Sequence, residues 1–171
     1  VMERSQEALR HYRMTIRQVA LASLSKTLAK KVGVKSCQEC ITFALAARDL
    51  NRLVYHSASI ARHVCALKEK KEFTKEISDI IAGISKVAYE MQEKAIEAFL
   101  KKDVKLAISV MDMMNDVKER ESVLLKTIIG KVRDVDTAVV AGMIARDLRR
   151  IAGYAVAIAD DAMNRKLTPK P

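Results

Sequence analysis

The stretch Ala47-Arg48-Asp49-Leu50-Asn51-Arg52 decides the fold, because it returns 98 positions later as Ala145-Arg146-Asp147-Leu148-Arg149-Arg150. Across residues 47–61 and 145–159, seven of fifteen positions carry the same residue. Both copies lie in strongly helical sequence. Their separation is much longer than the roughly 20–50 residues of a solenoid repeat. We therefore predict two related helical units in tandem, with the quoted stretch in the last helix of each.

The rest of the chain favours long helices. It has 171 residues, a length typical of one domain, with 5 Gly, 2 Pro and no Trp. Both prolines lie in the C-terminal tail, so none interrupts the body of the chain. Apolar residues recur at steps of three and four, the spacing of one helix face. We predict an all-α protein of about five long helices, at residues 3–32, from 36 onward, 72–101, 104–130 and from 134 onward.

Capping residues mark the ends of these helices. Gly33 follows two lysines and suits the left-handed position after a helix C-terminus. Glu39 stands three residues after a serine, which is the spacing of a capping box. Gly130 is expected to end the helix over 104–130. The N-cap candidates are Ser36, Asp103 and either Asp134 or Asp136.

The last helix carries the clearest apolar stripe. Its members are Val140, Ile144, Leu148, Ile151, Ala155, Ile158 and Ala162. The counterparts 98 residues earlier are Thr42, Ala46, Leu50, Leu53, Ser57, Ile60 and Val64, a thinner stripe because two members are polar. We predict that Leu50, Leu53, Leu148 and Ile151 belong to the core.

The helices are shared unequally between the two units. We predict a first unit over residues 1–70 with two helices and a second over 71–171 with three, each an antiparallel bundle because the loops are short. If the units are equivalent, the first lacks its opening helix. Two amphipathic helices leave an apolar groove, so we expect an upstream segment or another chain to fill it.

The net charge is +10 and lies mostly in the first half, since residues 1–70 carry +8 and residues 71–171 carry +2. This distribution is that of a solvated surface or of one that binds an anionic partner. Nucleic acid is not favoured, because no aromatic stacking set or groove-reading motif accompanies the charge. A basic stripe on the first helix, Arg10, Arg13 and Arg17, is either solvated or paired, or else contacts an anionic protein or nucleic acid.

Targeting and redox features favour a cytoplasmic protein. No apolar run approaches the roughly 18 residues of a membrane span. The first residues are polar and charged, unlike a signal peptide, and they enter helical sequence at once, so we expect missing upstream residues. The three cysteines are an odd number, which argues against a disulfide framework.

The two quoted stretches, continued to Ile60-Ala61 and Ile158-Ala159, resemble the signature A-R-x-L-E-R-I-G-D-H-A-x-x-I-A of the PhoU family of phosphate uptake regulators. That resemblance covers essentially the whole chain. It implies two tandem three-helix bundles, the first without its opening helix. It also implies a phosphate transporter ATPase or a sensor kinase as partner, and we expect a homodimer.

The signature departs from the family where some members bind metal clusters through E-x-x-x-D. The two positions that are acidic in those members are occupied here by Asn51 and Tyr55 in the first copy and by Arg149 and Gly153 in the second. Without the carboxylates that share metal ions, we expect no metal and no cofactor. Asp49 and Asp147 lie on a different side of the helix and do not substitute.

The charged residues of the motif have two readings. They form ion pairs within or between helices, or they bind a partner protein. On the second reading the candidate partner-binding residues are Arg48, Asp49, Arg52, Arg146, Asp147 and Arg150, together with the stripe on the first helix.

Two further groups have structural readings. Cys37-x-x-Cys40 offers half of a zinc site, with His56, His63 or Cys65 to complete it, but these lack chelating spacing and free thiols are favoured. Met111, Met113 and Met114 are expected to fill the core.

No phosphate-cradling glycine loop or nucleophile elbow is present, so we predict a non-enzymatic protein. The favoured hypothesis is a PhoU-like regulator of phosphate uptake or signalling that acts through protein contacts. The alternative is the effector or oligomerisation domain of a transcription regulator whose DNA-binding domain lies upstream.

Overall fold

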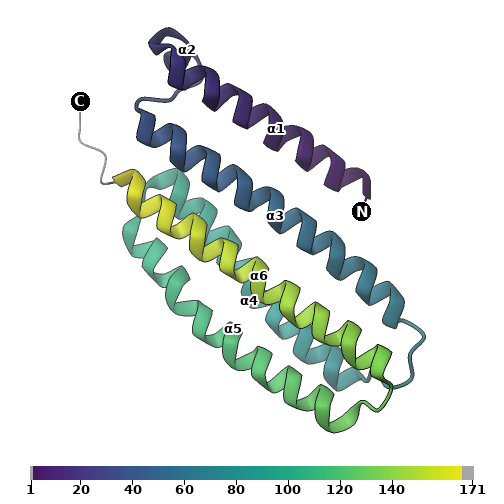
Figure 1. The fold of residues 1–171 in the computed structure, drawn as a ribbon. Coiled ribbons are helices and arrows are strands. Elements are labelled where there is room, and N and C mark those ends of the chain that lie inside the picture. The colour runs from purple at the N-terminus through teal and green to yellow at the C-terminus, as the bar shows by residue number, and fades with distance from the viewer. Residues whose placement is uncertain (1, 167–171) are drawn as a thin grey trace.

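The computed structural model describes residues 2–166, apart from the side chains of Met2 and Cys37. Over this range the elements are all α-helices, which confirms the predicted class. In chain order they are α1 (Met2–Leu24), α2 (Lys26–Lys31), α3 (Cys37–Leu67), α4 (Lys75–Lys101), α5 (Val104–Lys131) and α6 (Val135–Lys166). Helices α1, α3, α6 and α5 lie side by side, and α4 lies behind α6 (Figure 1).

The predicted first helix is interrupted, so the described range holds six helices where five were expected. Ser25 has an extended backbone with φ of −146°, and its side chain accepts a hydrogen bond from the Leu28 N–H at 3.4 Å. Serine caps a new helix here because its hydroxyl competes for backbone groups that a continuous helix would pair. The prediction of one helix over residues 3–32 is therefore wrong at this residue.

The other caps follow the sequence closely. Gly33 adopts φ of +76° and closes α2, with its N–H donating to the Lys30 carbonyl at 3.3 Å. The N–H of Val34 donates to the Ala29 carbonyl at 2.9 Å, which completes a Schellman motif. The predicted N-caps are observed at Ser36, Asp103 and, of the two candidates, Asp134.

Two helix bounds differ from the prediction. Helix α4 begins at Lys75, because Thr74 accepts the Ile77 N–H and acts as its N-cap. Helix α5 continues to Lys131, so Gly130 lies within its last turn and does not end it. The predicted division between two units falls in the connection between α3 and α4, and it stays a prediction.

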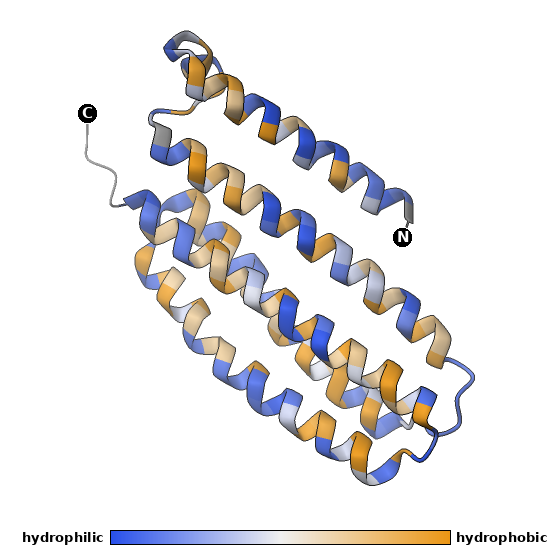
Figure 2. Ribbon diagram, in the orientation of Figure 1, coloured by the Kyte–Doolittle hydropathy of each residue, from blue (hydrophilic) through white to orange (hydrophobic). Residues whose placement is uncertain are grey.

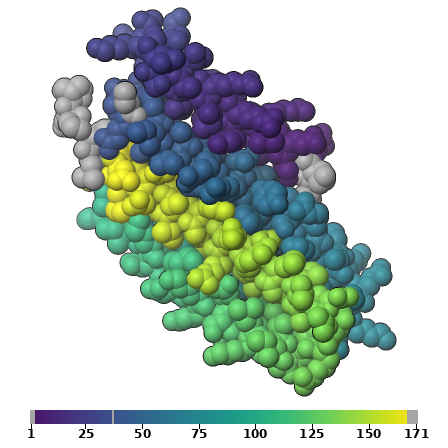
Figure 3. All heavy atoms as spheres, viewed as in Figure 1, coloured from purple at the N-terminus to yellow at the C-terminus, as the bar shows by residue number. Residues whose placement is uncertain are grey.

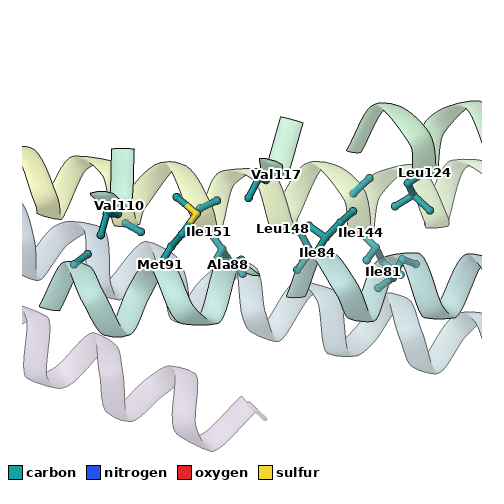
Figure 4. Close-up of a cluster of buried hydrophobic side chains, with 14 of the residues drawn as sticks. Ile81, Ile84, Ala88, Met91, Val110, Val117, Leu124, Ile144, Leu148 and Ile151 are labelled. Carbon is teal, nitrogen blue, oxygen red and sulfur yellow. The ribbon is translucent and has the colours of Figure 1, made fainter. Parts of the chain in front are cut away.

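The largest core lies between α4, α5 and α6, which pack against one another as a three-helix bundle. Apolar side chains from the three helices point toward each other (Figure 4). These include Ile84 and Met91 of α4, Val117 of α5 and Ile144 of α6, all fully buried. Figure 2 shows that apolar and polar residues alternate around each helix, the pattern of helices with one buried face.

Helix α3 extends this bundle by packing along α6, and α1 packs on α3. Figure 3 shows α1 at one edge of the molecule and α5 toward the opposite edge. Where α1, α2 and the start of α3 meet, Ala22, Val34 and Cys40 form a small separate core cluster. Within residues 2–166, no helix combines the length and hydropathy needed to cross a lipid bilayer.

A buried ion cluster ties the start of α3 to the ends of α4 and α6. Glu39 is 5% exposed, and its carboxylate lies 3.0 Å from Nζ of Lys102 and 3.7 Å from Nη2 of Arg165. Burial raises the pKa of Glu39, but hydrogen bonds from the Lys35 N–H and from Lys102 outweigh burial, and the net pKa lies below its ordinary value. The Arg165 guanidinium also lies over two aromatic rings, those of Phe43 and Phe99.

The core prediction is correct for the second motif copy and wrong for Leu50. Leu148 is 3% exposed and Ile151 is 8% exposed, whereas Leu50 is 38% exposed and Leu53 is half-buried. The reason is that α4 covers this side of α6, while in the described residues no helix covers the equivalent side of α3. Sequence identity therefore did not give the two leucines the same surroundings.

An apolar groove results from this difference. It is a cavity of about 560 Å³ between α3 and α4, with α6 as its floor. Its lining residues include Leu50, Leu53, Val54 and Ile60 of α3, Ala88, Tyr89 and Ile96 of α4, and Leu148 and Ile151 of α6. This is the kind of groove that the unequal helix count predicted.

Candidate functional site

The two motif copies lie on neighbouring antiparallel helices, α3 and α6 (Figure 1). His56 and Tyr154 occupy equivalent positions in the two copies, and Nε2 of His56 lies 3.3 Å from the Tyr154 hydroxyl oxygen. Near one end of the pair, the Gln38 side chain donates to the Asn164 carbonyl at 3.1 Å. The two copies of the motif therefore contact each other across the interface between α3 and α6.

The motif carboxylate Asp147 is buried in this interface, at 1% exposure. Its Oδ1 lies 3.0 Å from Nδ1 of His56, and its Oδ2 lies 3.8 Å from Nδ1 of His63. Because an ionised carboxylate only accepts hydrogen bonds, Nδ1 of His56 is the donor in the shorter contact. In the neutral imidazole, Nε2 then accepts from the Tyr154 hydroxyl. This chain of contacts fixes Asp147 at the centre of the interface.

The equivalent carboxylate, Asp49, is 2% exposed and is held by a cation from its own copy. Nε and Nη2 of Arg48 donate to its two oxygens at 3.0 and 3.2 Å, and this pairing raises the pKa of Arg48. Asp161, which is 5% exposed, lies close enough to Asp49 for the two carboxylates to repel each other electrostatically. Burial, with the charges of Asp49 and Asp160, raises the pKa of Asp161 to about 6, although Arg48 partly opposes this shift.

Five arginines of the two copies line one cavity of about 640 Å³ between α3, α5 and α6, here called the arginine cavity. They are Arg48, Arg52, Arg146, Arg149 and Arg150. Its wall also includes Asp49, Glu121, Met114, Gly153, Tyr154 and Ala157. Two pairs, 48 with 146 and 52 with 150, are equivalent positions of the motif. The antiparallel packing thus brings to one place cations that lie about a hundred residues apart in the chain.

Three of these arginines are oriented by buried acids. Arg48 is held by Asp49, and Nη2 of Arg146 lies 3.6 Å from Oδ1 of Asp147. Nη1 of Arg149 donates at 3.1 Å to Glu121, which is 8% exposed on α5. Because each carboxylate is buried beside its partner, it limits the directions in which the guanidinium can point.

The structure separates the candidate partner-binding residues into two groups. Arg52 and Arg150 are exposed at the arginine cavity, with Arg48 and Arg146 beside them, whereas Asp49 and Asp147 lie beneath the surface. The second group, Arg10, Arg13 and Arg17, is exposed on α1 and does not line this cavity. Their role in partner binding stays a prediction.

The residues considered for zinc are dispersed. His56 and His63 face Asp147, Cys40 is buried in the small cluster near α2, and Cys65 is exposed. Cys37 lies outside the described side chains. Among the described residues, no group of three or more His, Cys, Asp or Glu is placed to hold a metal ion. The three methionines of α5 are partly buried against the main core.

Sequence reasoning missed the contributions of Glu121 and Tyr154 to the site. Both lie on helices with a buried apolar face, and neither is one of the seven residues that the two motif copies share. Tyr154 has a signal in principle, since it is the counterpart of His56 and both are polar aromatic residues whose rings lie close together. Glu121 has none, because its partner Arg149 lies on another helix.

Residues 81–162, which span most of α4, all of α5 and most of α6, match the PhoU domain. This match supports a relationship to the PhoU family for this part of the chain. The match includes the second motif copy and the α6 side of the arginine cavity.

A longer similarity is found with the phosphate-specific transport system accessory protein PhoU homolog 1 of Thermotoga maritima. The two chains are 27% identical over 137 residues, which cover 76% of this chain and 57% of the relative. The chain therefore spans a little more than half the length of this relative. No solved structure shows a significant match to the chain.

Proposed function

We propose that this protein is a regulator of phosphate uptake or phosphate signalling that acts by binding other proteins and catalyses no reaction. The PhoU domain supports the proposal, as does the relative named an accessory protein of a phosphate-specific transport system. The observation that carries it is the apolar groove between α3 and α4, which leaves hydrophobic side chains of a core-like seam open to solvent.

The groove has the chemistry of a helix-binding surface. Leu50 and Ile96 are each 38% exposed, and Tyr89 is 66% exposed. A long apolar channel between two helices fits the apolar face of an amphipathic helix, with anchors at helical spacing. Contiguous exposed apolar surface of this kind marks interaction sites in soluble proteins. By family resemblance, we propose the ATPase of a phosphate transporter or a phosphate sensor kinase as the cytoplasmic partner.

The test measures binding of the chain to both candidate partners from the same organism by biolayer interferometry. Leu50→Asp places a charge in the groove and is expected to weaken binding about tenfold or more. The matched control is Ile129→Asp, which adds the same charge at a side chain 77% exposed on α5 and outside the groove. Equal affinities for the two variants, or no binding by the parent chain, would contradict the proposal.

Self-association needs a separate measurement, because the expected homodimer competes for the same surface. Light scattering of the parent chain and of Leu50→Asp would detect a dimer that depends on the groove. If Leu50→Asp abolished a dimer and left partner binding unchanged, the groove would be a dimer interface and not the partner site.

A second candidate is the effector or oligomerisation domain of a DNA-associated transcription regulator. It is favoured by the basic first half, where Arg10, Arg13 and Arg17 are all exposed on α1. Fluorescence anisotropy with duplex DNA over a salt series tests direct contact. If the chain neutralises several DNA phosphates, the logarithm of the binding constant falls with the logarithm of the salt concentration, with a slope of about −0.9 for each phosphate. Absence of binding at low salt would exclude direct DNA contact by this part of the chain.

A further inference from the structure

We propose that the arginine cavity is a binding site for an oligophosphate group, such as free pyrophosphate or the diphosphate of a nucleotide. Five guanidinium groups from two helices line one space of about 640 Å³. Asp49 and Glu121 lie in the same wall and Asp147 lies 3.6 Å from Arg146, so the positive charges at the cavity outnumber these negative ones. The arginine cavity shares no lining residue with the apolar groove of the proposed function, so ligand binding here is independent of partner binding there.

The arrangement is a built site because buried acids orient part of it in advance. Asp49 engages one edge of Arg48 through Nε and Nη2, and Glu121 engages Nη1 of Arg149. A guanidinium carries five N–H donors in a fixed plane, so each of these arginines keeps donors for a further acceptor. Orientation before binding reduces the side-chain entropy lost when a ligand is captured.

Two arginines supply cations without a competing partner. Arg52 and Arg150, at equivalent positions of the motif, are exposed and make no ion pair with another residue in the range 2–166. Guanidinium groups match phosphate oxygens through paired hydrogen bonds, and they remain charged at any physiological pH. The equivalence of the two positions suits a ligand that presents more than one phosphate group.

The size and remaining wall of the cavity also favour a ligand larger than a single phosphate ion. Its volume lies within the range of about 300–1,000 Å³ typical of small-molecule sites. Met114, Tyr154 and Ala157 give it a partly apolar side, against which an organic group of a phosphate ester can pack. The same oligophosphate chemistry is available from inorganic pyrophosphate and from a nucleoside diphosphate, so the experiment includes both.

Isothermal titration calorimetry of the chain at low salt, without divalent metal, compares pyrophosphate, ADP and inorganic phosphate. We expect saturable binding of pyrophosphate, ADP or both. The double variant Arg52→Gln with Arg150→Gln should weaken it about tenfold or more. The control, Arg62→Gln with Arg133→Gln, removes the same charge from exposed arginines outside the cavity and should change affinity less than about twofold.

Gly153→Glu tests the same site without removing an arginine. A Cβ at Gly153 meets no atom within 4 Å, so the helix accepts a side chain there, and the new carboxylate would enter the cavity. We expect it to abolish pyrophosphate and ADP binding. The proposal is overturned if neither ligand binds, if inorganic phosphate binds as tightly as both, or if the control double variant loses as much affinity as the cavity variant.

Discussion

Leu148 and Leu50 offer a test of how far tertiary packing separates two identical pieces of sequence. Both follow Ala-Arg-Asp in a long helix, so their local helical preferences are closely matched. Leu148 is 3% exposed within the main core, whereas Leu50 is 38% exposed at the apolar groove. Truncation of each leucine to alanine therefore compares the stability lost at a buried position with that lost at an exposed one, in nearly the same local sequence.

The expected losses of stability differ severalfold. Leu148→Ala removes buried methyl groups and leaves a cavity among packed helices, which costs about 3 kcal/mol. Leu50→Ala loses only part of the transfer free energy of a leucine side chain. Because Leu50 borders the open groove, its truncation leaves no closed cavity. We expect a loss of about 1 kcal/mol there.

Urea denaturation followed by far-UV circular dichroism measures both losses. With a slope of about 2 kcal/mol per molar urea, the midpoint should fall by about 1.5 M for Leu148→Ala and about 0.5 M for Leu50→Ala. The slopes of the variants should agree with that of the parent, as a check on two-state behaviour. Equal losses at low protein concentration would refute the reasoning, because Leu50 would then be as well covered in solution as Leu148.

Three further predictions concern single residues. Asp161→Asn should stabilise the protein at pH 8 by up to about 3 kcal/mol, because the pKa of Asp161 is about 6 in the folded state and 3.8 in the unfolded state. Since the folded state takes up the proton first as pH falls, this gain should shrink through pH 6 and vanish near pH 4, as measured by urea titrations across that range. Glu39→Gln should lower the free energy of unfolding at pH 7 by about 1–3 kcal/mol, because Lys102 and Arg165 then lose the negative charge beside them. Since the folded-state pKa of Glu39 is depressed, this loss should fade in acid, and a loss that is the same at pH 3 would argue against the ion pairs. Gly33→Ala should lower the melting temperature through about 1–2 kcal/mol of backbone strain at φ of +76°, and an unchanged melting temperature would show that the turn relaxes.

Local features of the fold were predictable where neighbouring residues settle them. Gly33, Ser36, Asp103 and Asp134 act at helix ends through hydrogen bonds to backbone groups within a few residues, and the sequence displays those partners directly. The break at Ser25 was not foreseen, because an apolar spacing that continues on both sides concealed a single competing hydroxyl.

The duplicated motif and its arginines could likewise be read from the chain, but their arrangement could not. Helical periodicity places Arg52 and Arg150 on helix surfaces without saying that those surfaces face one cavity. Burial of Asp49 and Asp147 was equally hidden, since a charged residue beside arginines is most often solvated.

The amino-acid order alone determined that this protein is helical and where most of its helices start, since these depend on contacts within a few residues, and it displays the motif that occurs twice. The packing of α4 on α6 decided that Leu148 is buried while Leu50 stays open at the groove, and the packing of α3, α5 and α6 brought five arginines to one cavity. These properties depend on residues of different helices, and their contacts exist only after the helices have packed.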